Sequence, residues 1–210
     1  MTMTFELTQD EGEYLVRLAR RAAEAYLSKR QIIKAPADVP AKLKEQCGVF
    51  VTINAVRGSG HELRGCIGFP YPTTGLVKAV IESAISSAAH DPRFSPMTTE
   101  ELDQVVFEVS VLTPPEPVEV EKPHDYSKKI KVGRDGLIVE RGHCKGLLLP
   151  QVPVELGWDE ETFLCECCVK AGLPPDSWLL DGTGICRFQA IIFQEATPKG
   201  NIVRKEIDTK

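Results

Sequence analysis

The sequence lacks the features that mark a secreted or membrane-spanning chain. Within its 210 residues, no apolar run approaches the roughly 20 residues that a helix needs to cross a bilayer. The first fourteen residues are polar and acidic, without the basic flank and apolar core of a signal or transit peptide. We therefore expect a soluble cytoplasmic protein without a membrane partner.

The sequence also lacks an excess of positive charge. Its 25 Lys and Arg residues are outnumbered by 30 Asp and Glu residues, so the formal net charge is −5 and the isoelectric point is about 5.5. A broad phosphate-binding surface is normally basic, so nucleic acid is expected to be a weak and local partner at most. The local candidate is a basic cluster, for which a solvated charged face is the more ordinary interpretation. The cluster consists of Lys122, Lys128, Lys129, Lys131 and Arg134.

No metal-binding or cofactor-binding motif is complete. A structural zinc site usually needs two pairs of ligands, and the chain has a single C-x-x-C pair, Cys165 and Cys168, inside an expected helix. The glycine-rich loop at 58–60 matches neither a Walker nor a dinucleotide-binding pattern. We therefore expect no metal and no cofactor.

The cysteine count argues against a disulfide framework. The number is odd and no secretory signal accompanies it. Most of these residues are expected to be reduced thiols that pack as small apolar side chains. The seven are Cys47, Cys66, Cys144, Cys165, Cys167, Cys168 and Cys186.

The chain does contain helices and strands without a regular βαβ alternation, which favours an α+β fold with a largely antiparallel sheet. Apolar periodicity predicts helices over 8–30, 74–89 and 159–171. Thr8 and Glu11 form a capping box for the first, and Thr74 is expected to cap the second. β-branched content predicts a strand over 48–56, and 63–69 is expected to return as its hairpin partner. Further strands are expected over 105–112 and 185–193.

The middle of the chain differs from its flanks in proline and charge content. Prolines and charges concentrate at 113–129, and Pro174 and Pro175 mark a second break. Short strands at 130–132 and 137–140 are expected to form a hairpin. We therefore predict a larger α+β domain from 1–115 and 181–210, with a smaller inserted α+β subdomain at 116–180.

The stretch around Cys66 is the first candidate for chemistry. In an extended strand, Arg64 and Cys66 point to one face, and a guanidinium beside a thiol favours the thiolate. Gly65 and Gly68 lack a Cβ and permit close approach of a backbone or a ligand. The pattern is compatible with a nucleophile or a redox thiol. The alternative, a small core residue in a strand that carries a glycine bulge, is the more ordinary role of a free cysteine.

The second candidate is the turn at 90–94. His90 can serve as an acid or a base, although a helix C-terminus favours its imidazolium form and suits a charge stabiliser. Alternatively, His90 caps the helix while Asp91 and Arg93 form a turn. Both interpretations stay open at this point.

Together these residues predict one cleft. The helix at 74–89 follows the Cys66 strand after a short turn, and packing back across it would return His90 towards the strand. The expected reactions are acyl or alkyl transfer through sulfur, or redox exchange, with a binding cleft in which Cys66 is only a wall as the alternative. The predicted catalytic residues are Cys66, Arg64 and His90, and the predicted substrate-binding residues are Gly65, Gly68, Asp91, Arg93, Pro150 and Gln151.

The hexapeptide LRGCIG at 63–68 resembles the signature of the AMMECR domain family, the product of the AMME syndrome candidate gene, called AmmeMemoRadiSam system protein A in prokaryotes. The similarity extends through HDPRF at 90–94, GLLLPQV at 146–152 and GWD at 157–159. The resemblance implies a two-domain α+β protein, with the larger domain built from both chain ends and the hexapeptide near an interdomain cleft.

The resemblance also implies functional association with a Memo-like protein and a radical SAM protein. The implied process is modification of a nucleic acid or of another biomolecule, with a small-molecule or macromolecular substrate. No reaction is implied, so two functions stay open. One is an enzyme with a reactive cysteine, and the other is a non-catalytic binding or adaptor module, RNA-binding modules included.

Overall fold

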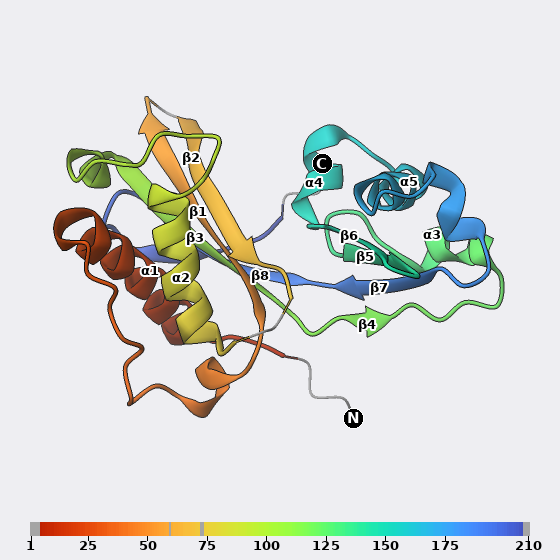
Figure 1. Cartoon of the computed structure of the whole chain (residues 1–210), viewed down its shortest axis with the longest axis horizontal. Helices are drawn as coiled ribbons and strands as arrows, with labels where there is room; N and C mark the ends of the chain where they lie inside the picture. Colours follow the sequence, from red (N-terminus) through yellow and green to blue (C-terminus); the bar gives the residue numbers. More distant parts are fainter. Residues whose placement is uncertain (1–4, 59, 72–73, 208–210) are drawn as a thin grey trace. The chain divides into compact units, whose positions relative to one another are not determined.

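Helices and antiparallel sheets occur together in both parts of the chain, which confirms the predicted α+β class (Figure 1). The structure is a computed structural model and describes residues 5–58, 60–71 and 74–207. The chain divides into two compact units. Of the described residues, the first contains those up to Leu112 together with Ile191–Lys205, and the second contains Thr113–Ala190 and residues 206–207.

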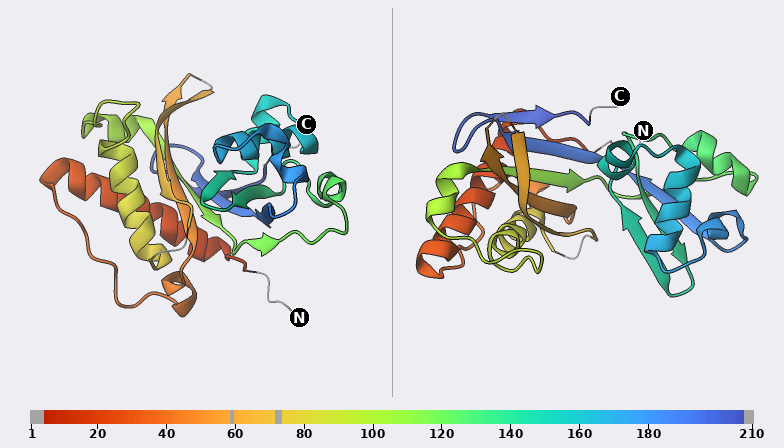
Figure 2. Two further views of the ribbon diagram at one scale, coloured as in Figure 1. Left: turned by 45° about the vertical axis from the view of Figure 1, so that its right-hand side comes forward. Right: turned by 90° about the horizontal axis from the view of Figure 1, so that it is seen from above.

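The first unit is built on a five-stranded sheet with the strand order β2-β1-β3-β8-β9. Strand β1 pairs antiparallel with both β2 and β3, and β8 pairs antiparallel with β9. Helices α1 and α2 lie on the same face of this sheet (Figure 2). The element bounds are α1 Gln9–Lys29, α2 Leu76–Ala89, β1 Gly48–Arg57, β2 Gly60–Phe69, β3 Val105–Leu112, β8 Ala190–Glu195 and β9 Ile202–Lys205, with short 3₁₀ segments at Ala41–Lys44 and Glu100–Gln104.

The two helices begin in different ways. The capping box predicted for α1 is confirmed, because the Thr8 side chain accepts from the Glu11 N–H while the Glu11 side chain accepts from the Thr8 N–H. The prediction for α2 is wrong. Its N-cap is Gly75, which has no side chain to accept a hydrogen bond, and Thr74 lies one residue too early.

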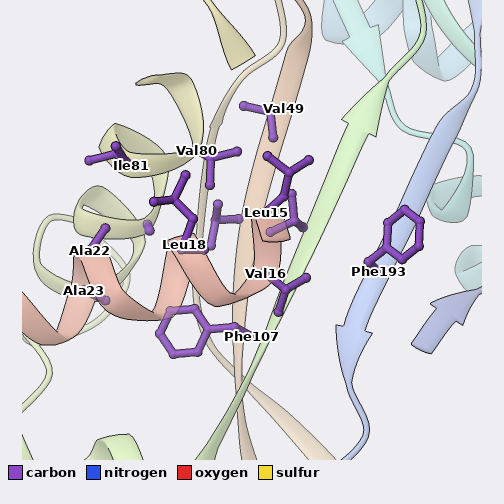
Figure 3. Packing of buried hydrophobic residues seen from close by; sticks show 14 of the residues in the cluster. Leu15, Val16, Leu18, Ala22, Ala23, Val49, Val80, Ile81, Phe107 and Phe193 are labelled. Carbon is purple, nitrogen blue, oxygen red and sulfur yellow. The ribbon is translucent and has the colours of Figure 1, made fainter. Parts of the chain in front are cut away.

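The core lies between the two helices and the sheet. Figure 3 shows Leu15 and Leu18 of α1 and Val80 of α2 among side chains of the strands, and all three are almost fully buried. Burial alternates along β1, since Val49, Val51 and Ile53 are buried. The intervening side chains of β1 point to the opposite side of the sheet. We call that side the second face.

A buried ion pair joins α1 to the far strands of the sheet. Arg20 donates from Nε and Nη2 to the two carboxylate oxygens of Glu195, each at 2.6 Å. The guanidinium also donates to the carbonyls of Leu102 and Val105, and Glu195 accepts from the Phe107 N–H. Because each charged group is paired and hydrogen-bonded, its burial is tolerated.

The second unit contains a four-stranded sheet with the order β4-β7-β5-β6, and α5 packs across one face of it (Figure 2). Phe163, Leu164 and Trp178 are among its most buried side chains. The bounds are β4 Glu116–Pro117, α3 Tyr126–Lys129, β5 Gly136–Arg141, β6 Cys144–Leu148, α4 Gln151–Leu156, α5 Glu160–Lys170 and β7 Gly184–Phe188, with 3₁₀ segments at Pro123–Asp125 and Pro175–Leu179.

Two predicted strands differ from the structure. Residues 130–132 form no strand, because the Asp135 carboxylate accepts from the Lys131 N–H and closes a turn; β5 pairs with β6 instead. The single strand predicted over 185–193 is split into β7 and β8, which belong to different sheets. The break falls at Gln189, whose N–H and C=O both bond to Thr113.

Candidate functional site

Cys66 lies on β2, the edge strand of the first sheet, directly opposite Thr52 of β1. The Thr52 hydroxyl donates to Cys66 Sγ over 3.2 Å. Both side chains are half-buried on the second face. The thiol is therefore held by a specific partner and is still partly accessible.

The backbone of Cys66 is held by an ion pair. Its N–H donates to Asp91 Oδ2 at 2.8 Å, and its carbonyl accepts from Arg93 Nη2 at 3.1 Å. Arg93 in turn donates to both carboxylate oxygens of Asp91. Hydrogen bonds from Arg93 hold the pKa of Asp91 well below its ordinary value, against the opposing effect of burial. Asp91 and Arg93 thus take the place of a neighbouring strand at this point of the sheet edge.

The glycine next to Cys66 makes room for α2. A Cβ at Gly65 would collide with the carbonyl oxygen of Ser87. The Ser87 hydroxyl accepts from the Ile67 N–H at 2.8 Å and donates to the Val51 carbonyl at 2.7 Å, so it bridges β2 and β1. The close approach predicted at Gly65 is therefore made by the helix backbone.

Gly68 is also surrounded by protein, since a Cβ there would meet the Val49 carbonyl and the Phe50 ring. A substrate-binding role for Gly65 and Gly68 stays a prediction.

Arg64 is directed away from the thiol by an irregularity in the strand. Between Ile53 and Asn54 the register shifts, which leaves Arg64 as the extra residue of a bulge. Its guanidinium donates to Glu101, with Nε 2.7 Å from Oε1, and lies 5.9 Å from the Phe94 ring centroid. The prediction that Arg64 sits beside the sulfur by simple alternation is thus wrong, because the bulge breaks the alternation.

The thiol is less acidic than an ordinary cysteine. Burial raises the pKa of Cys66, and the Glu108 and Asp91 carboxylates raise it further, while the Thr52 hydrogen bond and the Arg93 charge act in the opposite direction. The expected activation by a guanidinium is therefore outweighed.

His90 contacts the first helix. It is the C-cap of α2, its N–H donates to the Ser86 carbonyl, and its Nε2 lies 3.2 Å from the Tyr26 hydroxyl. The two rings meet edge to face with centroids 5.7 Å apart. Of the predicted residues at 90–93, Asp91 and Arg93 thus contact Cys66, whereas the contacts of His90 are with α1 and within α2. A catalytic role for His90 stays a prediction.

Sequence reasoning missed three residues that form a chain of contacts or cross-strand pairs leading away from the thiol: Thr52, Glu108 and Lys205. Glu108 of β3 lies directly opposite Thr52 and is 6% exposed. Its Oε2 lies 3.0 Å from Nζ of Lys205 on β9. The signal for Glu108 was available, because an acidic residue interrupts the apolar strand VVFEVSVL. Nothing in the sequence indicates that Lys205 lies beside Glu108, because this depends on the order of the strands in the sheet.

Pro150 and Gln151 belong to the second unit, where Pro150 is the N-cap of α4. Both side chains are at least half-buried. The Oε1 atom of Gln151 is buried, and among the described residues it has no hydrogen-bond partner. Their participation in a substrate site stays a prediction.

The cysteines of α5 serve the core of the second unit. Cys167 and Cys168 are fully buried, and Cys165 accepts a hydrogen bond from Trp178 Nε1 over 3.4 Å. All seven cysteines are free thiols. Within residues 5–58, 60–71 and 74–207, no three His, Cys, Asp or Glu side chains are grouped so that they could hold a metal ion. The described helices also include none that is long and apolar enough to cross a membrane.

The basic cluster is partly neutralised. Lys128 pairs with Asp125 at 2.7 Å, and Arg134 pairs with Asp135 at 2.6 Å. A surface hollow of about 440 Å³ lies beside the cluster and mixes both signs of charge. Such a surface attracts a phosphate backbone less than an unpaired basic one would. The hollow is lined by Glu119, Val120, Glu121, Asp125, Lys128 and Lys129.

Comparison with known proteins gives concordant results. A protein-family model described as AMMECR1 matches residues 16–193. Protein PH0010 of Pyrococcus horikoshii is 56% identical over 206 residues, which cover 98% of this chain and all of that protein. A protein of Thermofilum pendens is 54% identical over 208 residues, which cover 96% of this chain and 98% of that protein.

A solved structure is similar as well. The crystal structure of PH0010, described as an uncharacterised protein, superimposes with a TM-score of 0.85 at 57% identity. The match covers 95% of this chain and 98% of that chain. The similarity thus extends over both units and includes the strand that carries Cys66.

Proposed function

The chain belongs to the AMMECR1 family, and from this premise we propose that it acts in a modification pathway with Memo-like and radical SAM proteins, in which Cys66 meets the substrate. The observation that carries the proposal is the way Cys66 is held. Its thiol, N–H and carbonyl each have a separate side-chain partner, although the residue lies on an edge strand. A side chain that serves only as filling has no need of such positioning.

The protonation state of the thiol restricts the chemistry. For transfer through sulfur, the thiol proton passes to a base, the sulfur bonds to an electrophilic carbon of the substrate, and the leaving group departs with its electron pair. Because burial raises the pKa of Cys66, its thiolate is less populated before substrate binds than that of an ordinary cysteine. We therefore propose a thiol that reacts when a bound substrate or partner removes its proton, and that is quiet otherwise.

The alternative is a non-catalytic binding or adaptor module in which Cys66 is part of the wall. The raised pKa of the thiol favours this alternative. An adaptor module that binds RNA gains little support, since Lys128 and Arg134 of the basic cluster already have acidic partners. The two proposals differ in whether the sulfur changes covalently.

Intact-mass spectrometry after incubation with the Memo-like protein, the radical SAM protein and S-adenosylmethionine separates them. We expect a mass increase on the wild-type chain that is absent in the Cys66→Ser variant. The increase should be retained in the control variant Cys144→Ser, because Cys144 is also half-buried but lies in the second unit. An adduct on both variants would assign the chemistry to another residue. An unmodified wild-type chain that still forms a stable complex with either partner would support the adaptor module.

A further inference from the structure

Three polar side chains form a row across the second face of the first sheet. Cys66 of β2 is opposite Thr52 of β1, and Thr52 is opposite Glu108 of β3. Side chains that are directly opposite on adjacent strands have Cβ atoms about 4.5–5.5 Å apart. The Glu108 carboxylate is therefore one strand away from the hydroxyl that contacts the sulfur.

The row ends in a cation on the last strand. Lys205 of β9 is opposite Ile192 of β8, and its side chain crosses β8 to place Nζ 3.0 Å from Glu108 Oε2. The side chain of Glu108 is 8% exposed and that of Lys205 is 51% exposed. A buried carboxylate needs such a partner, whereas the half-exposed ammonium remains open to exchange with solvent or ligands.

We propose that Lys205 is a positioning residue for the Cys66 thiol and acts through Glu108, so that the reactivity of the sulfur is controlled from the end strand of the sheet. With the ion pair formed, the carboxylate is partly neutralised and opposes a thiolate weakly. With the pair broken, the full negative charge opposes the thiolate across Thr52. The inference rests on the proposed function, since deprotonation of Cys66 is the step that it controls.

Two further ion pairs lie on or next to β2. Arg93 and Asp91, from the turn after α2, form an ion pair with each other. Arg64 on β2 pairs with Glu101 of the 3₁₀ segment before β3. The Glu108–Lys205 pair differs from these two because its cation comes from β9, at the opposite edge of the sheet from Cys66. An anionic group on a substrate or partner can therefore compete for Lys205 without disturbing the backbone of Cys66.

The test is iodoacetamide labelling of Cys66 against pH, measured by mass spectrometry on the purified full-length chain. We expect Lys205→Met to raise the labelling midpoint by about half a pH unit, a threefold loss of thiolate at a given pH, and Glu108→Gln to lower it by a similar amount. Lys205→Arg keeps the charge and should keep the wild-type midpoint. In the double variant Glu108→Gln/Lys205→Met, loss of the lysine should have no further effect.

Lys199→Met is the matched control, because it removes the same positive charge from a nearby position in the sequence. Lys199 pairs with the exposed Asp103 instead of with Glu108. Equal shifts in Lys199→Met and Lys205→Met would reduce the effect to net charge and overturn the proposal. The proposal would also be overturned if Lys205→Met raised the labelling midpoint as much in the Glu108→Gln variant as it does in the wild-type chain. Lys205 is half-exposed, so its variants test the proposal even if Glu108→Gln fails to fold. The assay needs no partner protein, and its failure leaves the modification pathway to be judged by the intact-mass experiment.

Discussion

Asp91 accepts a hydrogen bond from the backbone N–H of Cys66 at 2.8 Å, so the turn after α2 and the edge strand of the sheet are one hydrogen-bonded structure. The same carboxylate is bound by the Arg93 guanidinium, which also donates to the Cys66 carbonyl. The HDPRF and LRGCIG motifs are therefore two sides of one contact. In this contact, Asp91 and Arg93 fix the position of the Cys66 backbone.

Asp91→Asn should destabilise the protein by about 2 kcal/mol at pH 7, because it removes a charge-assisted acceptor that is almost fully buried. The pKa of Asp91 is lowered in the folded state, so its contribution is complete above the unfolded value near 4 and declines as the pH falls below it. Urea unfolding at several pH values measures this. Asp103→Asn, in an exposed pair, should show little loss, and a pH-independent cost of Asp91→Asn would contradict the explanation.

Gly65→Ala should destabilise the protein by about 2–4 kcal/mol, because the added Cβ meets the Ser87 carbonyl and α2 must move away. Gly60→Ala, on the same strand, is the matched control, since the nearest atom to its Cβ is 3.8 Å away. Thermal and urea unfolding of the two variants provide the comparison. Similar stabilities would show that α2 is not packed against Gly65 as described.

Arg20→Met should cost about 3–5 kcal/mol, because it leaves the Glu195 carboxylate buried without its cation. Arg20→Lys should recover only part of the loss, since an ammonium cannot reproduce the two parallel hydrogen bonds to Glu195. Arg17→Met, on the exposed side of the same helix, should have little effect. Urea unfolding with fluorescence detection measures all three, and an equal cost at positions 17 and 20 would refute the assignment.

The alkylation midpoint of wild-type Cys66 should lie above that of a free thiol, because burial raises its pKa. Arg64→Ala should leave the midpoint within experimental error, since that guanidinium is bound to Glu101. Arg93→Ala should raise it, because the Arg93 charge favours the thiolate. A midpoint well below the free-thiol value, with an upward shift in Arg64→Ala, would restore the activated nucleophile inferred from strand alternation.

RNA binding, if the basic cluster supports any, should be weaker than micromolar and little changed by Lys128→Glu with Lys129→Glu. The reason is local neutralisation, since Lys128 already pairs with Asp125. Titration against single-stranded RNA at two salt concentrations is the measurement. Submicromolar affinity that falls steeply with salt and is abolished by the double charge reversal would instead favour an RNA-binding module.

Features that depend on neighbouring residues could be predicted from the sequence. The capping box at Thr8 and Glu11 involves groups three residues apart, and β3 is a short segment rich in valine. The α+β class follows from the same local patterns. The Cys66 strand could likewise be located, because a glycine-rich loop at 58–60 predicts that the chain returns after it as the hairpin partner of the preceding strand.

Features that depend on distant residues were decided by the tertiary structure. The bulge at Arg64 follows from the pairing of β2 with β1, and it redirects a guanidinium that strand alternation assigns to the sulfur. The Glu108–Lys205 pair exists because β9 joins the same sheet as β3. A residue's charge and propensity are encoded at its own position, whereas its partner is set by which strands become neighbours. Cys66 could therefore be chosen as a candidate site residue from the sequence. The direction in which its surroundings move the pKa of its thiol could not be predicted from the sequence.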